Sequence, residues 1–161
     1  MRVSVVQVDA SMTGPKNRFA WLDAKIRQAA KKDVDLIIFP ELFLSGYNVG
    51  EALHQNAEAQ DGPFARRVAA QAKELNIAIG FGYPERDGDT VYNAFIFIDD
   101  QGRTLANHRK TILPPGDEHD WFATGSNVSV FRFKDATVAV LICYECEFPE
   151  IMRHAALEGA Q

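Results

Sequence analysis

Three chemically complementary side chains follow runs of residues that are typical of β-strands. They are Glu41, Lys110 and Cys143. In α/β proteins, binding and catalytic sites are built at the carboxyl edge of the sheet, so equivalent positions after three strands can bring such groups together. A thiol attacks an electrophilic carbon when a base takes its proton and a positive group stabilises the oxyanion that forms. The carboxylate and the ammonium group are suited to these two roles.

Each of these groups also has an ordinary structural interpretation. A cysteine after an apolar strand is commonly a buried packing residue. A glutamate after a proline commonly caps a helix or lies in solvent, and a lysine in Arg109-Lys110-Thr111 commonly lies in solvent. The hypothesis of a catalytic site therefore depends on the three groups occurring together at equivalent strand-to-loop junctions.

A second cysteine offers a different chemistry. Cys143 and Cys146 form a C-x-x-C pair at a predicted strand-to-helix junction, which is the spacing of thioredoxin-like redox proteins and of half of many zinc sites. There is no second C-x-x-C pair, and the four histidines have no ligand spacing, so we expect no metal. The thiol chemistry described above requires no organic cofactor either. We predict that Cys146 is a small buried hydrophobe on the following helix, able to oxidise with Cys143. A redox protein is the main alternative to a hydrolase, and a catalytically idle binding or assembly subunit is the other.

The elements that must position these groups alternate between strands and helices. The apolar run 36–39 predicts a strand covered on both faces, and turn residues at 87–89 and 99–102 predict antiparallel neighbours. Prolines and glycines without a clear period predict a long, functional loop over 111–127. This order indicates an α/β layered domain with a mixed sheet, whose helices cover one face. The predicted strands are 2–8, 36–39, 77–83, 91–98, 104–109, 129–133 and 137–142, and the predicted helices are 17–32, 63–75 and a segment starting at about 149.

Composition narrows the class of protein. The chain has 161 residues, of which 47% are hydrophobic, and these values predict one globular domain over residues 1–161. Its net charge of -5 and its scattered basic residues make nucleic acid an unlikely partner. The apolar start is too short for a signal peptide, and no segment approaches the length of a membrane span. We therefore expect no membrane association and a cytoplasmic location.

The segments around the three groups resemble the nitrilase superfamily of carbon–nitrogen hydrolases, and the resemblance extends along the entire chain. Three ordered signatures carry it, and together they are far more specific than any one alone. The matching segments are Phe39-Pro40-Glu41-Leu42 with Ser45-Gly46-Tyr47, then Tyr92-Asn93-Ala94 followed by His108-Arg109-Lys110-Thr111-Ile112-Leu113, and finally Leu141-Ile142-Cys143-Tyr144-Glu145 with Phe148-Pro149-Glu150.

The resemblance implies a role for each catalytic candidate. Cys143 corresponds to the nucleophile of the family, Glu41 to its catalytic glutamate and Lys110 to its lysine. Glu118, followed by Trp121-Phe122 and Gly125 as in the family, corresponds to a second glutamate that helps to organise the site, although a surface carboxylate in an acidic loop is the alternative.

The resemblance also implies an architecture. We expect an α-β-β-α sandwich with a mixed sheet, its four layers formed when two units pair through helices, as a homodimer or a larger homo-oligomer. The family's domain continues beyond Gln161, so we expect this chain to hold the N-terminal portion and to be truncated at its C-terminus.

The expected reaction is cleavage of a carbon–nitrogen bond in a small amide through a thioester, with release of ammonia or an amine. Tyr144 follows the cysteine where nitrilases typically have a tryptophan, which favours an amidase. We expect Tyr47 and Tyr144 to line the substrate pocket.

Many members have an arginine beside the residue corresponding to Phe148, whereas Glu147 occupies that place here. If Glu147 faces the pocket, it favours a substrate with an ammonium group; if it faces a subunit contact, it says nothing about the substrate.

Overall fold

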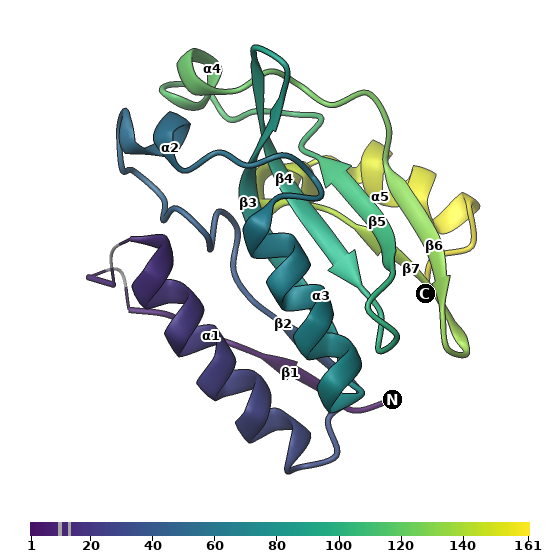
Figure 1. Cartoon of the computed structure of the whole chain (residues 1–161). Coiled ribbons are helices and arrows are strands. Elements are labelled where there is room, and N and C mark those ends of the chain that lie inside the picture. The colour runs from purple at the N-terminus through teal and green to yellow at the C-terminus, as the bar shows by residue number, and fades with distance from the viewer. Residues whose placement is uncertain (10, 13) are drawn as a thin grey trace.

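A five-stranded mixed sheet forms the centre of the molecule in the computed structural model, which describes residues 1–9, 11–12 and 14–161 (Figure 1). Its strand order is β1-β2-β3-β4-β5. The first three strands are parallel, and the last three are antiparallel to their neighbours, which confirms the predicted mixed sheet. The strands are β1 (Val3–Val5), β2 (Leu36–Ile38), β3 (Ala78–Asp87), β4 (Thr90–Ile98) and β5 (Thr104–Arg109).

Two helices connect the parallel strands and cover one face of this sheet. They are α1 (Pro15–Ala30) and α3 (Pro63–Leu75), and both begin with proline, whose fixed φ suits the first helical position. Ile37 of β2 packs in the core on the helix side, whereas Leu36 packs on the opposite side with Phe133. The strand is therefore covered on both faces, as its apolar sequence predicts.

A two-stranded hairpin covers the other face of the sheet. It consists of β6 (Ser129–Phe133) and β7 (Ala136–Val140). The ring of Phe97 on β4 lies 4.8 Å from that of Phe131 and 5.0 Å from that of Phe133, measured between centroids. Aromatic contacts thus join the hairpin to the central sheet.

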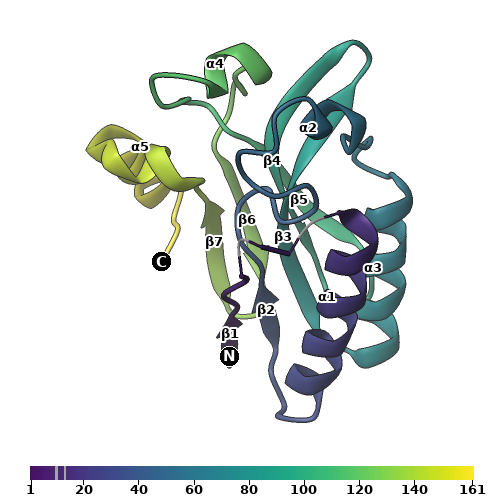
Figure 2. The same ribbon diagram turned by 90° about the vertical axis from the view of Figure 1, so that its left-hand side faces the viewer.

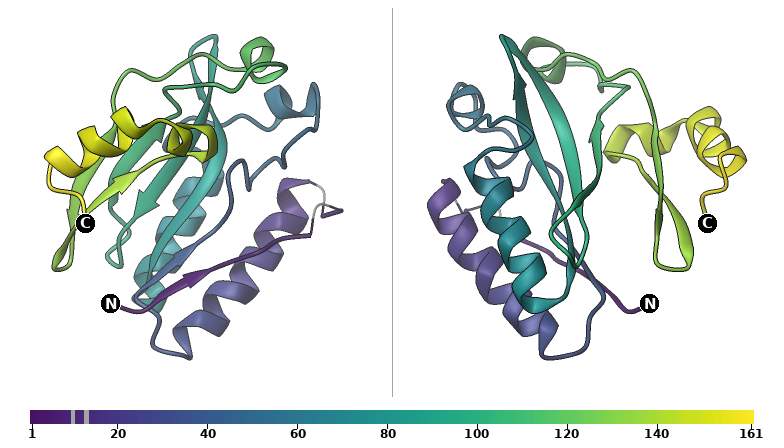
Figure 3. Two further views of the ribbon diagram at one scale, coloured as in Figure 1. Left: turned by 180° about the vertical axis from the view of Figure 1, so that it is seen from behind. Right: turned by 45° about the vertical axis from the view of Figure 1, so that its right-hand side comes forward.

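The chain ends in helix α5 (Pro149–Leu157), which lies beyond the hairpin on the side away from α1 and α3 (Figures 2 and 3). The order of layers is therefore helices, central sheet, hairpin and helix within one chain. This arrangement is the expected α-β-β-α sandwich, but the expectation that two units must pair to form its four layers is wrong. The expectation that the helices cover only one face is also wrong, because α5 lies on the opposite side of the molecule from α1 and α3.

The predicted boundaries differ from the observed ones where loops begin. Strand β1 is shorter than predicted, and β7 ends at Val140, before a 3₁₀ helix, η1 (Cys143–Glu147). The long loop after β5 contains a single short helix, α4 (Glu118–Trp121), and another short helix, α2 (Ala52–Gln55), precedes α3. Among the described residues, no helix is both long and apolar enough to cross a membrane.

Candidate active site

The loop that carries Glu41 packs directly on strand β3. The amide of Gly82 donates to the carbonyl of Pro40 at 3.1 Å, and the carbonyl of Gly82 accepts from the amide of Leu44 at 3.2 Å. A Cβ atom at position 82 would lie 2.4 Å from the nitrogen of Leu42 and 2.6 Å from the Cα of Glu41. Only glycine leaves room for the loop here, so the close approach of two backbones places Glu41 at the edge of the sheet.

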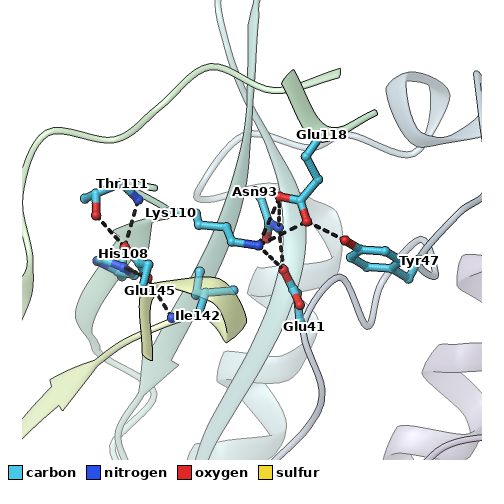
Figure 4. A network of polar contacts seen from close by, with 9 residues as sticks. All are labelled: Glu41, Tyr47, Asn93, His108, Lys110, Thr111, Glu118, Ile142 and Glu145. Atoms are coloured by element: carbon cyan, nitrogen blue, oxygen red, sulfur yellow. Dashed lines mark hydrogen bonds and ion pairs between the residues drawn. The ribbon is translucent and has the colours of Figure 1, made fainter. Parts of the chain in front are cut away.

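A fully buried ammonium group lies between two carboxylates at this edge. Lys110 follows β5, and its Nζ lies 2.9 Å from Oε1 of Glu41 and 3.0 Å from both carboxylate oxygens of Glu118 (Figure 4). Asn93 donates to Glu41 at 2.7 Å, and the hydroxyl of Tyr47 donates to Glu118 at 2.5 Å. The structure therefore brings together Glu41, Lys110 and Glu118 from segments that are far apart in the sequence.

The charge of this lysine is maintained by its two partners. Burial alone lowers the pKa of an amine, because it disfavours the charged form. For Lys110, the hydrogen bonds and charges of Glu41 and Glu118 outweigh the effect of burial, so its pKa lies above the ordinary value. Lys110 is thus a fixed positive group at neutral pH.

Cys143 stands at the start of η1, in an unusual backbone conformation. Its φ is 49°, in the left-handed region that residues other than glycine rarely adopt and that is often found at functional sites. Although Cys143 is exposed as a residue, partial desolvation and the charge and hydrogen-bonding effect of the nearby Glu41 carboxylate raise the pKa of its thiol, whereas the charge of Lys110 and the backbone N–H of Tyr144 lower it. The net shift is upward, so the thiol is protonated at neutral pH and needs a base before it can attack.

Two hollows open beside these groups. Glu41 and Cys143 line a hollow of about 340 Å³. Tyr47 and Glu118 line another, of about 560 Å³, whose walls contain both polar and apolar side chains. Both volumes fall in the range of about 300 to 1,000 Å³ that is usual for small-molecule sites.

Two of the three predicted substrate-binding residues lie outside both hollows. Tyr144 packs edge-on against Phe148, with ring centroids 5.1 Å apart, and Glu147 is exposed. Neither residue lines the hollow of Cys143 or that of Tyr47. The structure therefore gives no support to a pocket role for Glu147, whereas Tyr47 lines the hollow of Glu118 and not that of Cys143.

The prediction that Cys146 is buried on the following helix is wrong. Cys146 lies in η1, before α5, and it is exposed. Within this turn Glu145 is the buried residue, Tyr144 is half-buried, and Cys146 is exposed. Both cysteines are free thiols. Over residues 1–9, 11–12 and 14–161, no three His, Cys, Asp or Glu side chains are grouped so as to hold a metal ion.

Two buried polar residues that hold the site together were given no role on the basis of the sequence. Asn93, in a signature segment, is completely buried and contacts both Glu41 and Glu118. Glu145 is also completely buried and joins the turn of Cys143 to the segment of Lys110. Asn93 could have been predicted to be functional, because it is a polar residue in an otherwise largely apolar strand. The role of Glu145 could not, because its partners are brought to it only by the tertiary fold.

The sequence matches the family model described as carbon-nitrogen hydrolase over residues 2–161. The protein named "Hydrolase in pqqF 5'region" from Pseudomonas protegens is 48% identical over 132 residues, which are 80% of this chain and 46% of the relative. An (R)-stereoselective amidase from Pseudomonas sp. is 33% identical over 129 residues, with the same two coverages. The chain spans about half the length of these relatives.

The fold also matches solved structures. An amidase from Nesterenkonia sp. superposes with a TM-score of 0.91 at 28% identity, over 100% of this chain and 62% of the amidase chain. Mutants of the Nesterenkonia amidase have been solved in complex with butyramide and with acrylamide added to the active-site cysteine.

Proposed function

The chain belongs to the carbon–nitrogen hydrolase family, and from this premise we propose that it carries the thiol site of an enzyme that cleaves small amides. The observation that supports this proposal most strongly is the position of Lys110, whose buried ammonium contacts Glu41 and Glu118. Glu41 in turn lines the same hollow as Cys143 and raises the pKa of its thiol. The proposed nucleophile, base and positive group thus lie at one site before a substrate arrives.

In the proposed first step, Glu41 takes the thiol proton as the sulfur of Cys143 attacks the amide carbon. A C–S bond forms, and the carbonyl becomes an oxyanion that Lys110 and the backbone N–H of Tyr144 stabilise. Each such donor contributes about 3 kcal/mol to transition-state stabilisation. When the C–N bond breaks, Glu41 returns the proton to the nitrogen, and ammonia or an amine leaves.

In the second step, water attacks the thioester carbon while Glu41 accepts a proton from it. The C–S bond then breaks, the acid leaves, and the proton returns to the sulfur of Cys143. The thiol of Cys143 is thus neutral again at the end of each turnover, in keeping with its raised pKa.

Glu118 has a different proposed role. It holds Lys110 from the side opposite Glu41 and also contacts Asn93 and Tyr47. We assign it to the orientation of the lysine, so its loss is expected to lower kcat less than the loss of Glu41.

The proposed substrates are small amides. The relatives include amidases and nitrilases. Tyr144, in place of the tryptophan that is typical after the cysteine of nitrilases, favours amides over nitriles. The hollow of Cys143, about 340 Å³, suits a short acyl group.

Ammonia release from short aliphatic amides, amino-acid amides, ureido acids and nitriles tests this proposal. The full-length protein is compared with Cys143→Ser and with the matched control Cys146→Ser. We expect release from at least one amide, lost with Cys143→Ser and retained with Cys146→Ser. Undiminished release by Cys143→Ser would contradict the proposal.

The C-x-x-C redox function keeps one observation in its favour, since both thiols are free and exposed. A redox function does not explain the buried contacts of Lys110 with Glu41 and Glu118. Thiol–disulfide exchange that needs both cysteines, with no ammonia release from any compound, would favour the redox function over the hydrolase.

We also propose assembly as a homodimer or larger homo-oligomer. Helix α5 exposes Met152 at 50% and Leu157 at 80% of their accessible surface. Light scattering of the full-length protein tests this proposal, and a monomer at micromolar concentration would contradict it.

A further inference from the structure

A buried carboxylate that the proposed reaction does not use lies next to the nucleophile. Glu145 is completely buried. Its oxygens accept from the backbone N–H of Ile142 at 2.6 Å and from the backbone N–H and hydroxyl of Thr111 at 2.8 and 2.6 Å, and they contact Nε2 of His108 at 2.8 Å. A carboxylate can accept all four of these bonds at once, which offsets the cost of burying its charge.

The partners of Glu145 come from the two segments that carry reacting groups. His108 and Thr111 flank Lys110 at the end of β5, and Ile142 immediately precedes Cys143 (Figure 4). The lysine belongs to the central sheet, whereas the cysteine follows the hairpin on the other layer. Glu145 is therefore the bridge between layers at the point where their two catalytic groups must be aligned.

We propose that Glu145 is a positioning residue, which sets the distance between Cys143 and Lys110 through its bonds to Ile142, Thr111 and His108. This inference rests on the proposed hydrolase function. Cys143 has a φ of 49°, a conformation that is costly for a residue other than glycine. The bond from the N–H of Ile142 fixes the residue before it and so holds the turn in that conformation.

The ionised form of Glu145 is essential to this role. A glutamine at this position keeps the shape, but its NH₂ group places a donor against other donors. The tautomer of His108 follows from the same contact, since Nε2 must carry a proton to donate to the carboxylate. The other ring nitrogen, Nδ1, is buried and has no hydrogen-bond partner among the described residues.

Glu85 provides a matched control. It is 2% exposed and accepts from Asn107 at 2.8 Å and from Arg109 at 2.9 and 2.8 Å. It is thus another buried carboxylate bonded to β5, but it has no bond to the turn of Cys143. Loss of its charge is expected to affect stability without moving the nucleophile.

The test compares Glu145→Gln and Glu85→Gln in the full-length protein, on an amide that the unaltered protein hydrolyses. We expect Glu145→Gln to lower kcat by about 100-fold, the loss that a displacement of ~1 Å causes, with KM changed less than about threefold. Glu85→Gln is expected to retain kcat. Equal kcat values for the two variants would overturn the proposal.

Milder variants keep the test informative if Glu145→Gln does not fold. Thr111→Val removes only the hydroxyl bond and is expected to lower kcat about tenfold, the equivalent of one hydrogen bond. His108→Gln, which can still donate to Glu145, is expected to retain more activity than His108→Ala. Full kcat in Thr111→Val, or equal loss in the two His108 variants, would contradict the positioning role.

The same assay separates this inference from the proposed function. If Cys143→Ser abolishes turnover while Glu145→Gln retains full kcat, the hydrolase stands and the positioning role fails. If Cys143→Ser retains turnover, the proposed function fails, and the positioning role fails with it.

Discussion

The charged half of the candidate site and its thiol are held in contrasting ways. Lys110 is fully buried and fixed by three short contacts to Glu41 and Glu118 at the edge of the central sheet. Cys143 belongs to the outer layer, is exposed, and starts a 3₁₀ turn with a positive φ. One half is rigid through burial and ion pairing, and the other is accessible to a small molecule.

This contrast separates two requirements of catalysis. Groups that stabilise developing charge act best when they are oriented before the reaction, so that no reorganisation is needed in the transition state. A nucleophile must instead reach the substrate and later release the product. Substitutions that alter one half at a time test the two requirements separately.

Removal of the buried cation has the largest expected effect. Lys110→Met leaves Glu41 and Glu118 close together without their shared positive partner. We expect turnover to be lost and the free energy of unfolding to fall by about 3 kcal/mol, the lower end for a broken buried pair, because Glu41 is 19% exposed. Urea unfolding and ammonia release measure the two effects.

Lys134→Met is the matched control for this prediction. Lys134 pairs with Asp35, but the two side chains are 36% and 30% exposed. A surface pair contributes about 1 kcal/mol or less. If both lysine variants lost the same stability, the contrast between a buried and an exposed cation would not hold.

Displacement of Glu41, the proposed base, is expected to have a smaller effect on turnover. Gly82→Ala introduces a Cβ that would meet the Cα of Glu41 at 2.6 Å, so the loop must shift. We expect kcat to fall about 100-fold in a protein that still folds, as judged by circular dichroism. An unchanged kcat would show that the position of Glu41 tolerates displacement.

The sequence predicted the three catalytic candidates better than the contacts that hold them. Glu41 and Cys143 follow apolar runs, and Lys110 follows a strand that the turn at 99–102 precedes, so all three positions can be predicted from local sequence. The expected mixed sheet is confirmed. The burial of Cys146 was predicted wrongly because local pattern does not reveal which residue of a 3₁₀ turn faces inward. The role of Glu145 depends on donors as far away as His108, 37 positions earlier in the chain.

The pKa of the Cys143 thiol reports on its contact with Glu41, and it can be measured in a protein that keeps both groups. Because burial and then Glu41 raise the pKa of Cys143, alkylation by iodoacetamide in a Cys146→Ser background is expected to reach half its maximal rate above about pH 8.5, the ordinary value for a cysteine. Glu41→Gln removes one of the raising causes, so the midpoint should move to lower pH. A midpoint that does not move would contradict contact between the two groups.

Acid stability gives the smallest expected effect. Burial raises the pKa of Glu145, but its hydrogen bonds with His108 and Thr111 outweigh burial and lower it. The ionised group therefore stabilises the fold above the ordinary glutamate pKa of about 4.3, and this contribution is lost as the pH falls below that value. In urea unfolding, the stability difference between the unaltered protein and Glu145→Gln should be full at pH 7 and smaller at about pH 4. A difference that grows as the pH falls would contradict this sign.

Mass spectrometry of a rapidly quenched reaction with a short amide tests whether Cys143 is the nucleophile. We expect a transient acyl group on the peptide that contains Cys143, and neither adduct nor ammonia release in Cys143→Ala. Ammonia release that persists in Cys143→Ala, with no acyl group found on Cys143 of the unaltered protein, would contradict this role.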